Sequence, residues 1–446
     1  MWRTARPAQL AWRNASSSSS TTFTTSEVPD TPLKRIAGFA QLGASLAAAA
    51  VGGGGLMTEA SAEVLASHLC RMRGAALKLG QMLSLQDESM LPPPLAEALH
   101  TVRTHANIMP QSQLESMLAS ELGPGWESLF GSFDRQPIAA ASIGQVHRAV
   151  LKDGRDVAVK VQYPGVATSI TSDLGNLEAL LRVTNFAPRG LFVERIIESA
   201  KEELAAECDY ESEAKSQTLY AKMLEGQEEE FYVPAVIAEL STKAVITTEW
   251  VHDAVPIDEA VGEPLEVRNQ LARSLLALSL RELYEFRLVQ TDPNWSNFLY
   301  QKSTGRLCLI DFGATRSFKK EFVDEHLRLV WAAATRNREG FLSASENLGF
   351  LNGDESAEMV EAHVQAGWLS AEPFAEHAPY KFSEARLAER IGVHAAVFAK
   401  QRISPPPREV YALHRRLSGA ISTCAKLECE IECRDTLDDT LRAYSW

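Results

Sequence analysis

The chain has 446 residues, of which 45% are hydrophobic and 23% charged, so it is long enough for two or three globular units. Its formal net charge of −14 has the wrong sign for a nucleic-acid binder, which needs a basic face against the phosphates. The same charge argues against strong attraction to anionic lipid, although it is compatible with a local basic patch. We therefore expect no nucleic-acid partner.

The N-terminal region has the composition of a targeting segment. The first 26 residues contain Arg3, Arg6 and Arg13 and no acidic residue, and a Ser/Thr run follows at residues 16–22. This composition is typical of a mitochondrial or chloroplast transit peptide, and an unstructured tail without an address is the alternative. We assign residues 1–28 to a mitochondrial transit peptide.

Residues 36–57 carry no charge and are rich in Ala and Gly. The length suits a bilayer span, and small residues favour close helix contacts in membranes. A flexible linker is the alternative. We interpret residues 29–59 as a membrane-associated segment.

The rest of the chain predicts a helical extension, a β-rich part and a helical part. Apolar residues at three- and four-residue steps predict helices over 61–121, which a Gly-Pro-Gly turn at 123–125 ends, so the extension covers residues 60–125. The predicted strands are 143–150, 155–162, 232–237, 244–249 and 307–310, and the predicted helices between them are 170–181 and 193–224. Asp153-Gly154 indicates a hairpin between the first two strands. An α+β fold follows, with lobes at 126–247 and 248–446.

Three motifs occur in the order that protein kinases use. Lys160 ends the strand sequence Val-Ala-Val-Lys, where its charge requires a phosphate or carboxylate partner. Asp292 and Asn297 are five residues apart, as in a kinase catalytic loop, and Asp311 opens an Asp-Phe-Gly motif after an apolar strand. An edge-strand lysine and polar turns would explain each motif alone. Their common order favours a nucleotide site with Mg²⁺ on Asn297 and Asp311.

Two features depart from the kinase pattern. Of the three glycines in the phosphate loop, only Gly144 remains, because Ala139 and Ala141 replace the other two. Alanine cannot bring the backbone as close to a phosphate, so we expect this loop to hold phosphates differently. No Ala-Pro-Glu motif follows Gly313, so the segment that supports a peptide substrate is missing or very short.

Six cysteines occur without a short Cys-rich framework, which indicates a reducing compartment. Cys424, Cys429 and Cys433 cluster near the C-terminus without a matching histidine set. We interpret them as part of a reduced helix rather than as a metal site.

These features together resemble the UbiB family of atypical kinase-like proteins, in its mitochondrial coenzyme Q (ubiquinone) biosynthesis branch. The resemblance runs from about Ala75 to the C-terminus. It rests on five motifs, which are Lys78-Leu79-Gly80-Gln81, the stretch 139–146, Glu207-Cys208-Asp209-Tyr210, the stretch 290–297 and the stretch 309–316.

The resemblance implies a bilobal protein-kinase-like fold with the helical extension packed over the active site. It implies regulatory roles for the residues of two signatures, which are Lys78, Gly80, Gln81, Glu207 and Asp209. It implies a nucleotide loop of Ala139, Ala140, Ala141, Ser142 and Gly144, an adenine-binding hinge of Thr248, Glu249, Trp250 and Val251, and a pairing of Lys160 with Glu213. Asp292 and Lys160 would be catalytic. ATP and Mg²⁺ would be the cofactors.

The resemblance also implies a location at the inner mitochondrial membrane, facing the matrix. The partners would be ATP, membrane lipid or ubiquinone precursors, and the enzymes of ubiquinone biosynthesis, and a homodimer is compatible with the sequence. Three activities remain open: a membrane-stimulated ATPase or small-molecule kinase, a pseudokinase scaffold for a biosynthetic complex, and a conventional protein kinase. The absent Ala-Pro-Glu segment disfavours the last, and the complete set of catalytic residues disfavours the scaffold.

Overall fold

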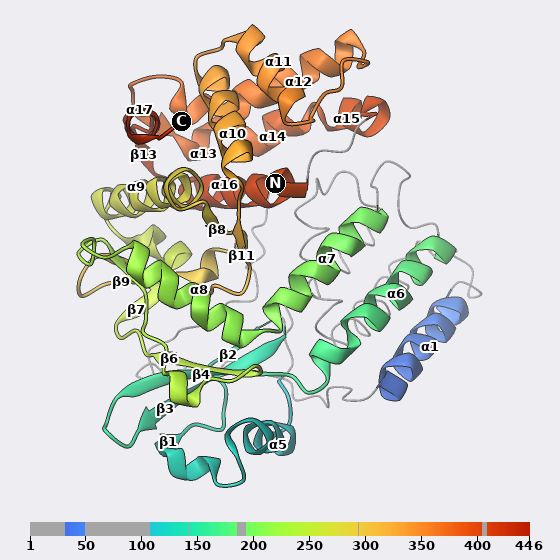
Figure 1. Ribbon diagram of the computed structural model, residues 1–446, viewed down its shortest axis with the longest axis vertical. Coiled ribbons are helices and arrows are strands. Elements are labelled where there is room, and N and C mark those ends of the chain that lie inside the picture. Colours follow the sequence, from blue (N-terminus) through green and yellow to red (C-terminus); the bar gives the residue numbers. More distant parts are fainter. Residues whose placement is uncertain (1–31, 50–107, 142, 185–192, 293, 404–407) are drawn as a thin grey trace. The chain divides into compact units, whose positions relative to one another are not determined.

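The computed structural model describes residues 32–49, 108–141, 143–184, 193–292, 294–403 and 408–446 (Figure 1). The chain divides into two compact units. The first contains residues up to Ala221 together with Pro234–His252, and the second contains Lys222–Val233 and Asp253–Trp446. Each unit therefore consists of two segments, and the four segments alternate between the units along the chain.

The first unit is built on an antiparallel sheet in the order β1-β3-β4-β6, with β2 pairing to β3. Its strands are β1 (Phe130–Phe133), β2 (Ala139–Ala140), β3 (Gly144–Leu151), β4 (Asp156–Gln162) and β6 (Val245–Glu249). The predicted β3–β4 hairpin is confirmed, and its Asp153-Gly154 turn places Gly154 at φ 90°, where glycine has no steric penalty. β4 is buried along most of its length, so its apolar run forms the centre of the core.

The helices of the first unit precede the sheet in the chain or lie between β4 and β6. They are α1 (Pro32–Ala49), α5 (Gln111–Leu122), α6 (Val166–Thr184), α7 (Val193–Glu207) and α8 (Tyr210–Met223), with short 3₁₀ helices at Trp126–Leu129 and Ala238–Leu240. α1, α6 and α7 lie side by side, with α6 in the middle (Figure 1). The predicted helix 193–224 is two helices, because the chain turns at Cys208 and Asp209.

Helix α1 covers part of the stretch interpreted as membrane-associated. Arg35 is buried on it and donates to Asp173 of α6 at 2.5 Å, and Ser169 donates to the same carboxylate oxygen at 2.9 Å. Among the described residues, no helix has the length and apolar content that a bilayer span requires. A membrane role for residues 29–59 stays a prediction, and residues 50–59 lie outside the described part of the chain.

The second unit contains most of the helices. They are α9 (Leu265–Arg281), α10 (Lys320–Ala334), α11 (Arg338–Asn347), α12 (Ala357–Ser370), α13 (Phe382–Ala385), α14 (Leu387–Gly392), α15 (Ala395–Gln401), α16 (Arg408–Lys426) and α17 (Arg434–Ala443). A π-helix, Glu282–Phe286, continues α9 directly, and 3₁₀ helices occur at Ile257–Gly262, Trp295–Asn297 and Glu372–Phe374.

Short strands join these helices. They are β5 (Phe231–Tyr232), β7 (Ala254–Pro256), β8 (Leu288–Gln290), β9 (Phe298–Gln301), β10 (Arg306–Leu309), β11 (Thr315–Ser317), β12 (Tyr380–Lys381) and β13 (Glu430–Ile431). The largest sheet of this unit has the order β5-β10-β9-β7, and β11 pairs with β8. The predicted strand at 307–310 is confirmed as β10.

One strand prediction is only partly right. Residues 232–237 were predicted as a single strand, but β5 covers Phe231–Tyr232 and runs parallel to β10 in the second unit. In the first unit Val236 bridges to Thr248, the Ile237 N–H donates to the Thr247 carbonyl, and the Glu249 N–H donates to the Ala235 carbonyl. The apolar pattern of this stretch reflects burial in two different units, which a local pattern cannot distinguish from one continuous strand.

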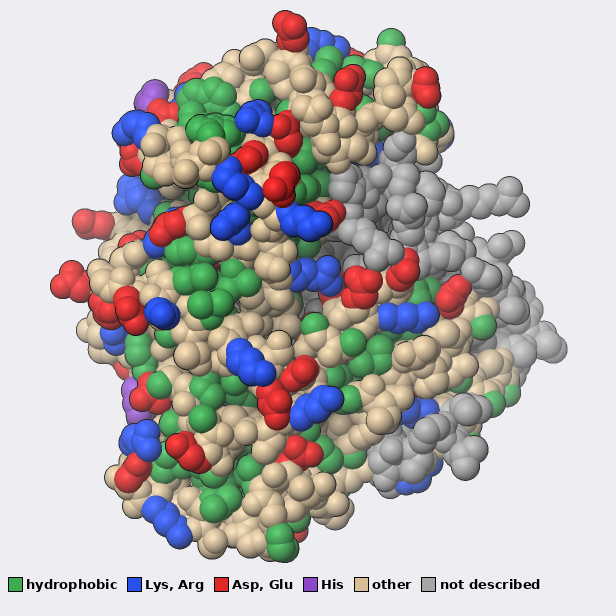
Figure 2. Space-filling view, in the orientation of Figure 1, with side chains coloured by type: hydrophobic (Ala, Val, Ile, Leu, Met, Phe, Trp, Pro, Cys, Tyr) green, Lys and Arg blue, Asp and Glu red, His purple; other side chains and the backbone are tan. Residues whose placement is uncertain are grey.

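On the face that Figure 2 shows, Lys and Arg side chains occur among Asp and Glu side chains over most of the described surface. The excess of negative charge is therefore not gathered there into one broad acidic area. This mixed surface is compatible with the expected absence of a nucleic-acid partner.

Candidate functional site

Lys160 of β4 is held by a carboxylate in the first unit. Its Nζ donates to Glu213 Oε1 at 2.9 Å and to Oε2 at 3.1 Å, and it lies 4.9 Å from the centroid of the Tyr210 ring. The Glu213 side chain is 2% exposed and the Lys160 side chain 17% exposed. The ammonium group is thus neutralised inside the fold by a residue 53 positions away in sequence.

The turn before α8 orients Glu213. Asp209 caps this helix, because its Oδ1 accepts the N–H of Ser212 at 3.1 Å and its carbonyl accepts the N–H of Glu213. Buried Gln162, at the end of β4, donates to the carbonyl of Cys208 at 2.9 Å and to that of Lys243 at 3.2 Å. The strand that carries Lys160 therefore also fixes the start of the helix that carries its partner.

Gln162 was not identified from the sequence. The available signal was a polar residue at the end of an otherwise apolar strand, but such a residue is ordinarily solvent-exposed. Glu207, the other acidic residue of this signature, is half-buried at the last position of α7.

The alanine stretch forms a tight hairpin with β3. Ala139 and Ala140 lie in β2, and the N–H of Ala141 donates to the carbonyl of Gly144 at 2.7 Å. None of the three alanines is among the non-glycine residues with positive φ, so their Cβ atoms cause no backbone strain. This geometry explains how the stretch tolerates alanine where kinases have glycine.

Gly144 is required for a different reason. A Cβ at this position would collide with the carbonyl oxygen of Val161 and would lie 3.0 Å from the Tyr210 hydroxyl. The retained glycine therefore permits close approach of β3 to β4 and to α8, and this packing requirement is independent of phosphate binding.

A small apolar surface lies beside the hinge. Ala139, Val146 and Ala158 are buried together, and Ile138 and Trp250 pack against them. The Trp250 ring also faces the Arg148 guanidinium at 5.3 Å, and the backbone N–H of Trp250 donates to the carbonyl of Asp156. Small and branched side chains of this kind suit a flat heteroaromatic ring such as adenine.

Of the other expected hinge residues, Thr248 and Glu249 are the last two residues of β6, and Val251 follows the strand. Thr248 lies opposite Ala158 in the sheet, the Glu249 N–H donates to the carbonyl of Ala235, and Val251 is buried.

In the second unit, the β9–β10 hairpin brings Asn297 and Asp311 to one end. Asn297 directly precedes β9, and Asp311 follows Ile310 after β10. Leu309 lies opposite Phe298, and the Ile310 N–H donates to the Asn297 carbonyl at 3.2 Å. Strand register therefore places both residues at the same end of the hairpin, with Ile310 rather than Asp311 directly opposite Asn297.

Asp292 is oriented by the loop between β8 and β9. Its Oδ1 accepts the N–H of Asn294 at 3.2 Å, and its Oδ2 accepts the Asn297 amide group at 3.1 Å. Asn294 in turn accepts the N–H of Ser296 and caps the short helix Trp295–Asn297. Since the Asn297 nitrogen faces Asp292, its amide oxygen is the atom left for a cation.

Asp311 is fixed in a similar way. Its Oδ1 accepts the N–H of Gly313 at 3.1 Å, and its carbonyl accepts Gln290 Nε2 at 3.4 Å. Gln290 and Thr291 stand before Asp292 where kinases usually have His and Arg. A carboxylate and an amide oxygen fit Mg²⁺, which prefers oxygen ligands and is commonly bound through one or two protein groups.

Four of the expected site residues cannot be placed. Lys78, Gly80, Gln81 and Ser142 lie outside the described residues, so their contacts with Glu207, Asp209 or a nucleotide stay predictions.

The segment after Gly313 is short. Strand β11 and helix α10 follow at once, so only residues 314–319 separate Gly313 from a helix. The sequence-based expectation of a missing or very short peptide-supporting segment agrees with this arrangement.

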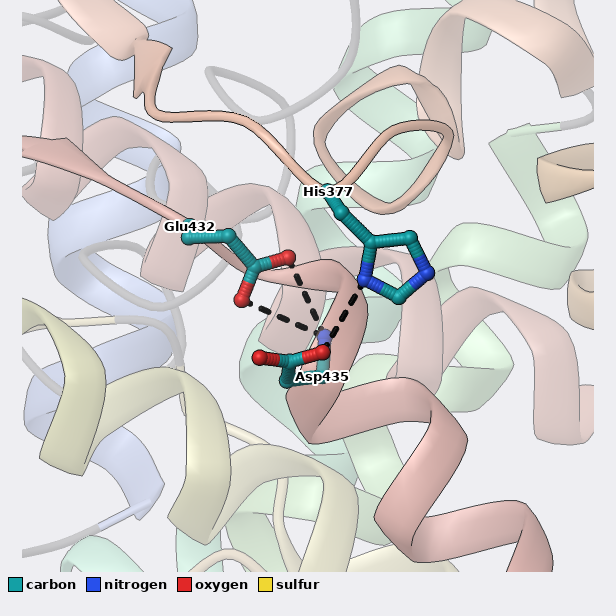
Figure 3. Close-up of side chains that lie close together, drawn as sticks. All are labelled: His377, Glu432 and Asp435. Atoms are coloured by element: carbon teal, nitrogen blue, oxygen red, sulfur yellow. Dashed lines mark hydrogen bonds and ion pairs between the residues drawn. The ribbon is translucent and has the colours of Figure 1, made fainter.

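A group of metal-ligand types also occurs near the C-terminus, where the ligand atoms of His377, Glu432 and Asp435 lie within 4.8 Å of one another (Figure 3). Hydrogen bonds account for the cluster. His377 Nδ1 bonds Asp435 Oδ1 at 3.0 Å, and Glu432 accepts the backbone N–H groups of Arg434 and Asp435 at the start of α17. We interpret it as a helix-capping arrangement.

Comparisons with known proteins find one family and several relatives. Residues 101–345 match the family described as the ABC1 atypical kinase-like domain. The chain is 44% identical to the atypical kinase COQ8B, mitochondrial, of Rattus norvegicus, covering 94% of this chain and 82% of that protein. It is 41% identical to the atypical kinase COQ8, mitochondrial, of Schizosaccharomyces pombe, covering 95% and 72%.

A solved structure is also similar. The complex of Rv3197 with erythromycin from Mycobacterium tuberculosis matches with a TM-score of 0.60 and 26% identity, covering 83% of this chain and 92% of that one.

Proposed function

The chain belongs to the ABC1 atypical kinase-like family, as its motifs predicted, and on this premise we propose that it binds ATP with Mg²⁺ and hydrolyses it or phosphorylates a small molecule. The proposed setting is ubiquinone biosynthesis at the inner mitochondrial membrane, facing the matrix, with stimulation by membrane lipid. Its relatives are named mitochondrial, which supports the compartment. Lipid or ubiquinone precursors and the enzymes of the pathway are its proposed partners.

The observation that carries this proposal is the pair of oxygen ligands at the end of the β9–β10 hairpin. Asn297 and Asp311 flank the same end of the hairpin and each is held by a hydrogen bond, and Asp292 accepts the bond from Asn297. A scaffold that only binds nucleotide does not require two metal ligands and an acidic residue in this arrangement.

Each group has a proposed role. Asp311 and Asn297 would hold Mg²⁺, which neutralises phosphate charge when bound. Lys160 would contact the phosphates while Glu213 keeps its ammonium group oriented. Asp292 would orient the attacking hydroxyl or water and accept its proton.

The nucleotide itself would be held by the alanine hairpin and the hinge. The residues proposed for the nucleotide loop are Ala139, Ala140, Ala141, Ser142 and Gly144, and those proposed for the hinge are Thr248, Glu249, Trp250 and Val251. Lys78, Gly80 and Gln81, with Glu207 and Asp209, would restrict access by large acceptors. Residues 314–319 leave little chain to support a peptide, which favours water or a small molecule as the acceptor.

ATP turnover by the full chain tests the proposal. We expect phosphate release that depends on Mg²⁺ and increases when phospholipid liposomes are added. Asp311→Asn should reduce turnover by about 10²-fold or more, as expected when a charge that stabilises the transition state is removed. The thermal shift caused by Mg-ATP should also decrease in this variant.

Two outcomes would overturn the proposal in different ways. Nucleotide binding without turnover in the wild-type chain would favour the scaffold. Equal turnover in wild type and Asp311→Asn would show that the hydrolysis does not come from this site.

A further inference from the structure

Helix α16 carries two basic residues that lie on aromatic rings next to Asn297. The Lys426 ammonium group is 4.2 Å from the centroid of the Trp295 ring, and the Arg416 guanidinium is 5.0 Å from the centroid of the Phe298 ring. Trp295 and Phe298 flank Ser296 and Asn297 in sequence. Both contacts lie within the second unit, and α16 packs against the short helix Trp295–Asn297.

Each basic residue is fixed by a carboxylate. Lys426 Nζ donates to Asp258 Oδ2 at 2.7 Å, and Arg416 Nε donates to Glu282 Oε2 at 2.7 Å. Asp258 and Glu282 are both buried, and Glu282 begins the π-helix after α9. The ion pair fixes the position of the cation. A cation that cannot move restrains the aromatic ring on its other side through the cation–π contact.

The restrained segment has few other side-chain restraints. Asn294 caps its start, the Asn297 amide bonds Asp292, and buried Ser296 Oγ has no hydrogen-bond partner among the described residues. The short helix also packs against the 3₁₀ helix Ile257–Gly262 and β7, and the two rings add side-chain contacts on both sides of Asn297 that come from α16.

We propose that Lys426 and Arg416 are positioning residues for Asn297. They hold the rings on both sides of it and so keep its amide oxygen oriented toward the metal. This inference rests on the proposed function, because it assumes that Asn297 is a metal ligand.

Lys426 is the better residue to test. Lys426→Met leaves the Asp258 carboxylate, 8% exposed, without its cation, but the Lys426 side chain is 36% exposed. Arg416 and Glu282 are 3% and 0% exposed, so removing Arg416 would endanger folding more. Lys426→Met removes the charge and keeps the length of the side chain, and Lys426→Arg keeps a cation that can still lie on Trp295.

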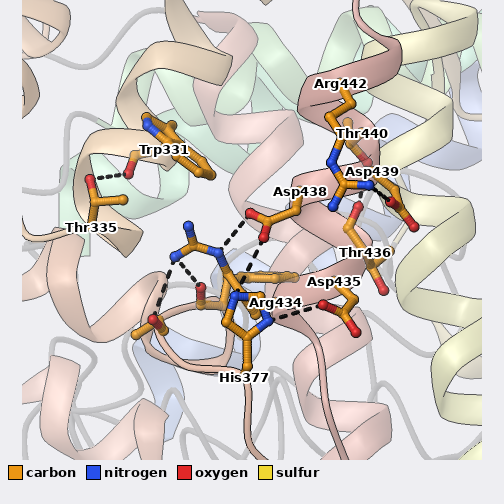
Figure 4. Close-up of polar contacts among 12 residues, drawn as sticks. Trp331, Thr335, His377, Arg434, Asp435, Thr436, Asp438, Asp439, Thr440 and Arg442 are labelled. Carbon is orange, nitrogen blue, oxygen red and sulfur yellow. Dashed lines mark hydrogen bonds and ion pairs between the residues drawn. The ribbon is translucent and has the colours of Figure 1, made fainter.

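The chain offers a matched control (Figure 4). Arg434 lies 4.5 Å from the centroid of the Trp331 ring and donates from Nε to Asp438 at 2.7 Å, so it repeats the carboxylate–cation–ring arrangement. Its other partners are the carbonyls of Phe374 and Ala375, which are outside the catalytic segment. Arg434→Met therefore removes a similar contact without touching the residues around Asn297.

The experiment measures Mn²⁺ binding by the full chain saturated with a non-hydrolysable ATP analogue, using the EPR signal of free Mn²⁺. We expect Lys426→Met to weaken Mn²⁺ binding by roughly fivefold, a ratio in the range of one cation–π contact. Lys426→Arg and Arg434→Met should stay within about twofold of wild type. Metal-free binding of the analogue should change little in all three variants.

Trp295→Leu and the double variant Lys426→Met/Trp295→Leu complete the test and replace Lys426→Met if that protein does not fold. The double variant should bind Mn²⁺ no more weakly than Trp295→Leu alone, because both changes remove the same contact. Additive losses, or equal losses in Lys426→Met and Arg434→Met, would overturn the inference.

Asp311→Asn separates this inference from the proposed function. If Asp311→Asn weakens Mn²⁺ binding and Lys426→Met does not, only the positioning role of α16 is wrong. If Asp311→Asn leaves Mn²⁺ binding unchanged, the metal assignment itself is wrong.

Discussion

The two units hold their candidate site residues by different means. In the first unit, Lys160 is fixed by a nearly buried ion pair with Glu213. In the second unit, Asp292 and Asp311 accept hydrogen bonds from the backbone N–H groups of Asn294 and Gly313. Asp292 makes no ion pair within the part of the chain that the structure describes.

The difference follows from what each group would bind. A half-buried ammonium group needs a counter-charge at all times, because leaving it without one is costly. Carboxylates that are to receive a cation are better oriented by N–H dipoles, which fix their direction without neutralising them. We therefore expect substitutions in the first unit to lower the free energy of unfolding, and substitutions in the second to weaken Mg-ATP binding.

The largest effect on stability is expected from breaking the ion pair. Glu213→Gln should lower the free energy of unfolding by about 3–5 kcal/mol, since it leaves the Lys160 charge without its partner in a largely buried site. Urea unfolding measures this. The double variant Lys160→Met/Glu213→Gln should be more stable than Glu213→Gln, and equal stabilities would contradict the comparison.

A somewhat smaller effect is expected where β3 approaches β4. Gly144→Ala should lower the free energy of unfolding by about 2–3 kcal/mol, because its Cβ would meet the backbone carbonyl of Val161, which cannot rotate away. Gly175→Ala in α6 is the control. No residue that the structure describes lies within 4 Å of its Cβ position, so it should stabilise by about 0.5–1 kcal/mol. A Gly144→Ala protein as stable as wild type would show that the strands can separate freely.

His147 of β3 should make the first unit sensitive to acid. Burial lowers the pKa of His147 from 6.5 to about 4. Between these values the unfolded chain binds a proton that the folded chain does not, so this contribution is complete above pH 6.5 and is lost as the pH falls toward 4. From pH 7.5 to pH 5 the loss should be about 2 kcal/mol.

His147→Gln is the control for this prediction, because it cannot titrate. Urea unfolding of both proteins at the two pH values isolates the contribution of the histidine. The same pH dependence in both would exclude it.

The smallest effect on stability is expected in the second unit. Asn294→Ala removes the cap of Trp295–Asn297 and should lower the free energy of unfolding by about 1 kcal/mol. Asn337→Ala removes a similar cap from α11, where the side chain accepts the Gly340 N–H. Both should lose similar stability, but only Asn294→Ala should reduce the thermal shift caused by Mg-ATP. Equal shifts in the two variants would mean that the loop does not act on the metal site.

Local sequence patterns correctly predicted the elements that depend on residues close together in the chain. The Asp153-Gly154 turn between β-rich runs indicated the β3–β4 hairpin, and the apolar run before Asp311 indicated β10. The order of Lys160, Asp292, Asn297 and Asp311 indicated a kinase-like nucleotide site. Five longer motifs, 78–81, 139–146, 207–210, 290–297 and 309–316, indicated the atypical kinase family, which the comparisons confirm.

The same patterns failed where partners are distant in sequence. The stretch 232–237 was given to one sheet, although Phe231 and Tyr232 pair with β10 in the second unit. Helix 193–224 was continuous in the prediction, although Gln162 from a remote strand stabilises a turn at Cys208. The periodicity of apolar residues along the sequence does not reveal such contacts, because they depend on which surfaces meet after folding.

By itself the sequence determined the hairpins, most helix positions, the family and the identity of the acidic and amide groups, because turn geometry and residue chemistry act over a few residues. Only the tertiary structure decided that Gly144 is needed for close packing, that β5 belongs to the second unit, and that Lys426 and Arg416 hold the rings beside Asn297. These features join residues from about 17 to more than 100 positions apart in the chain, and their energies come from burial and close contact, which exist only once the chain has folded.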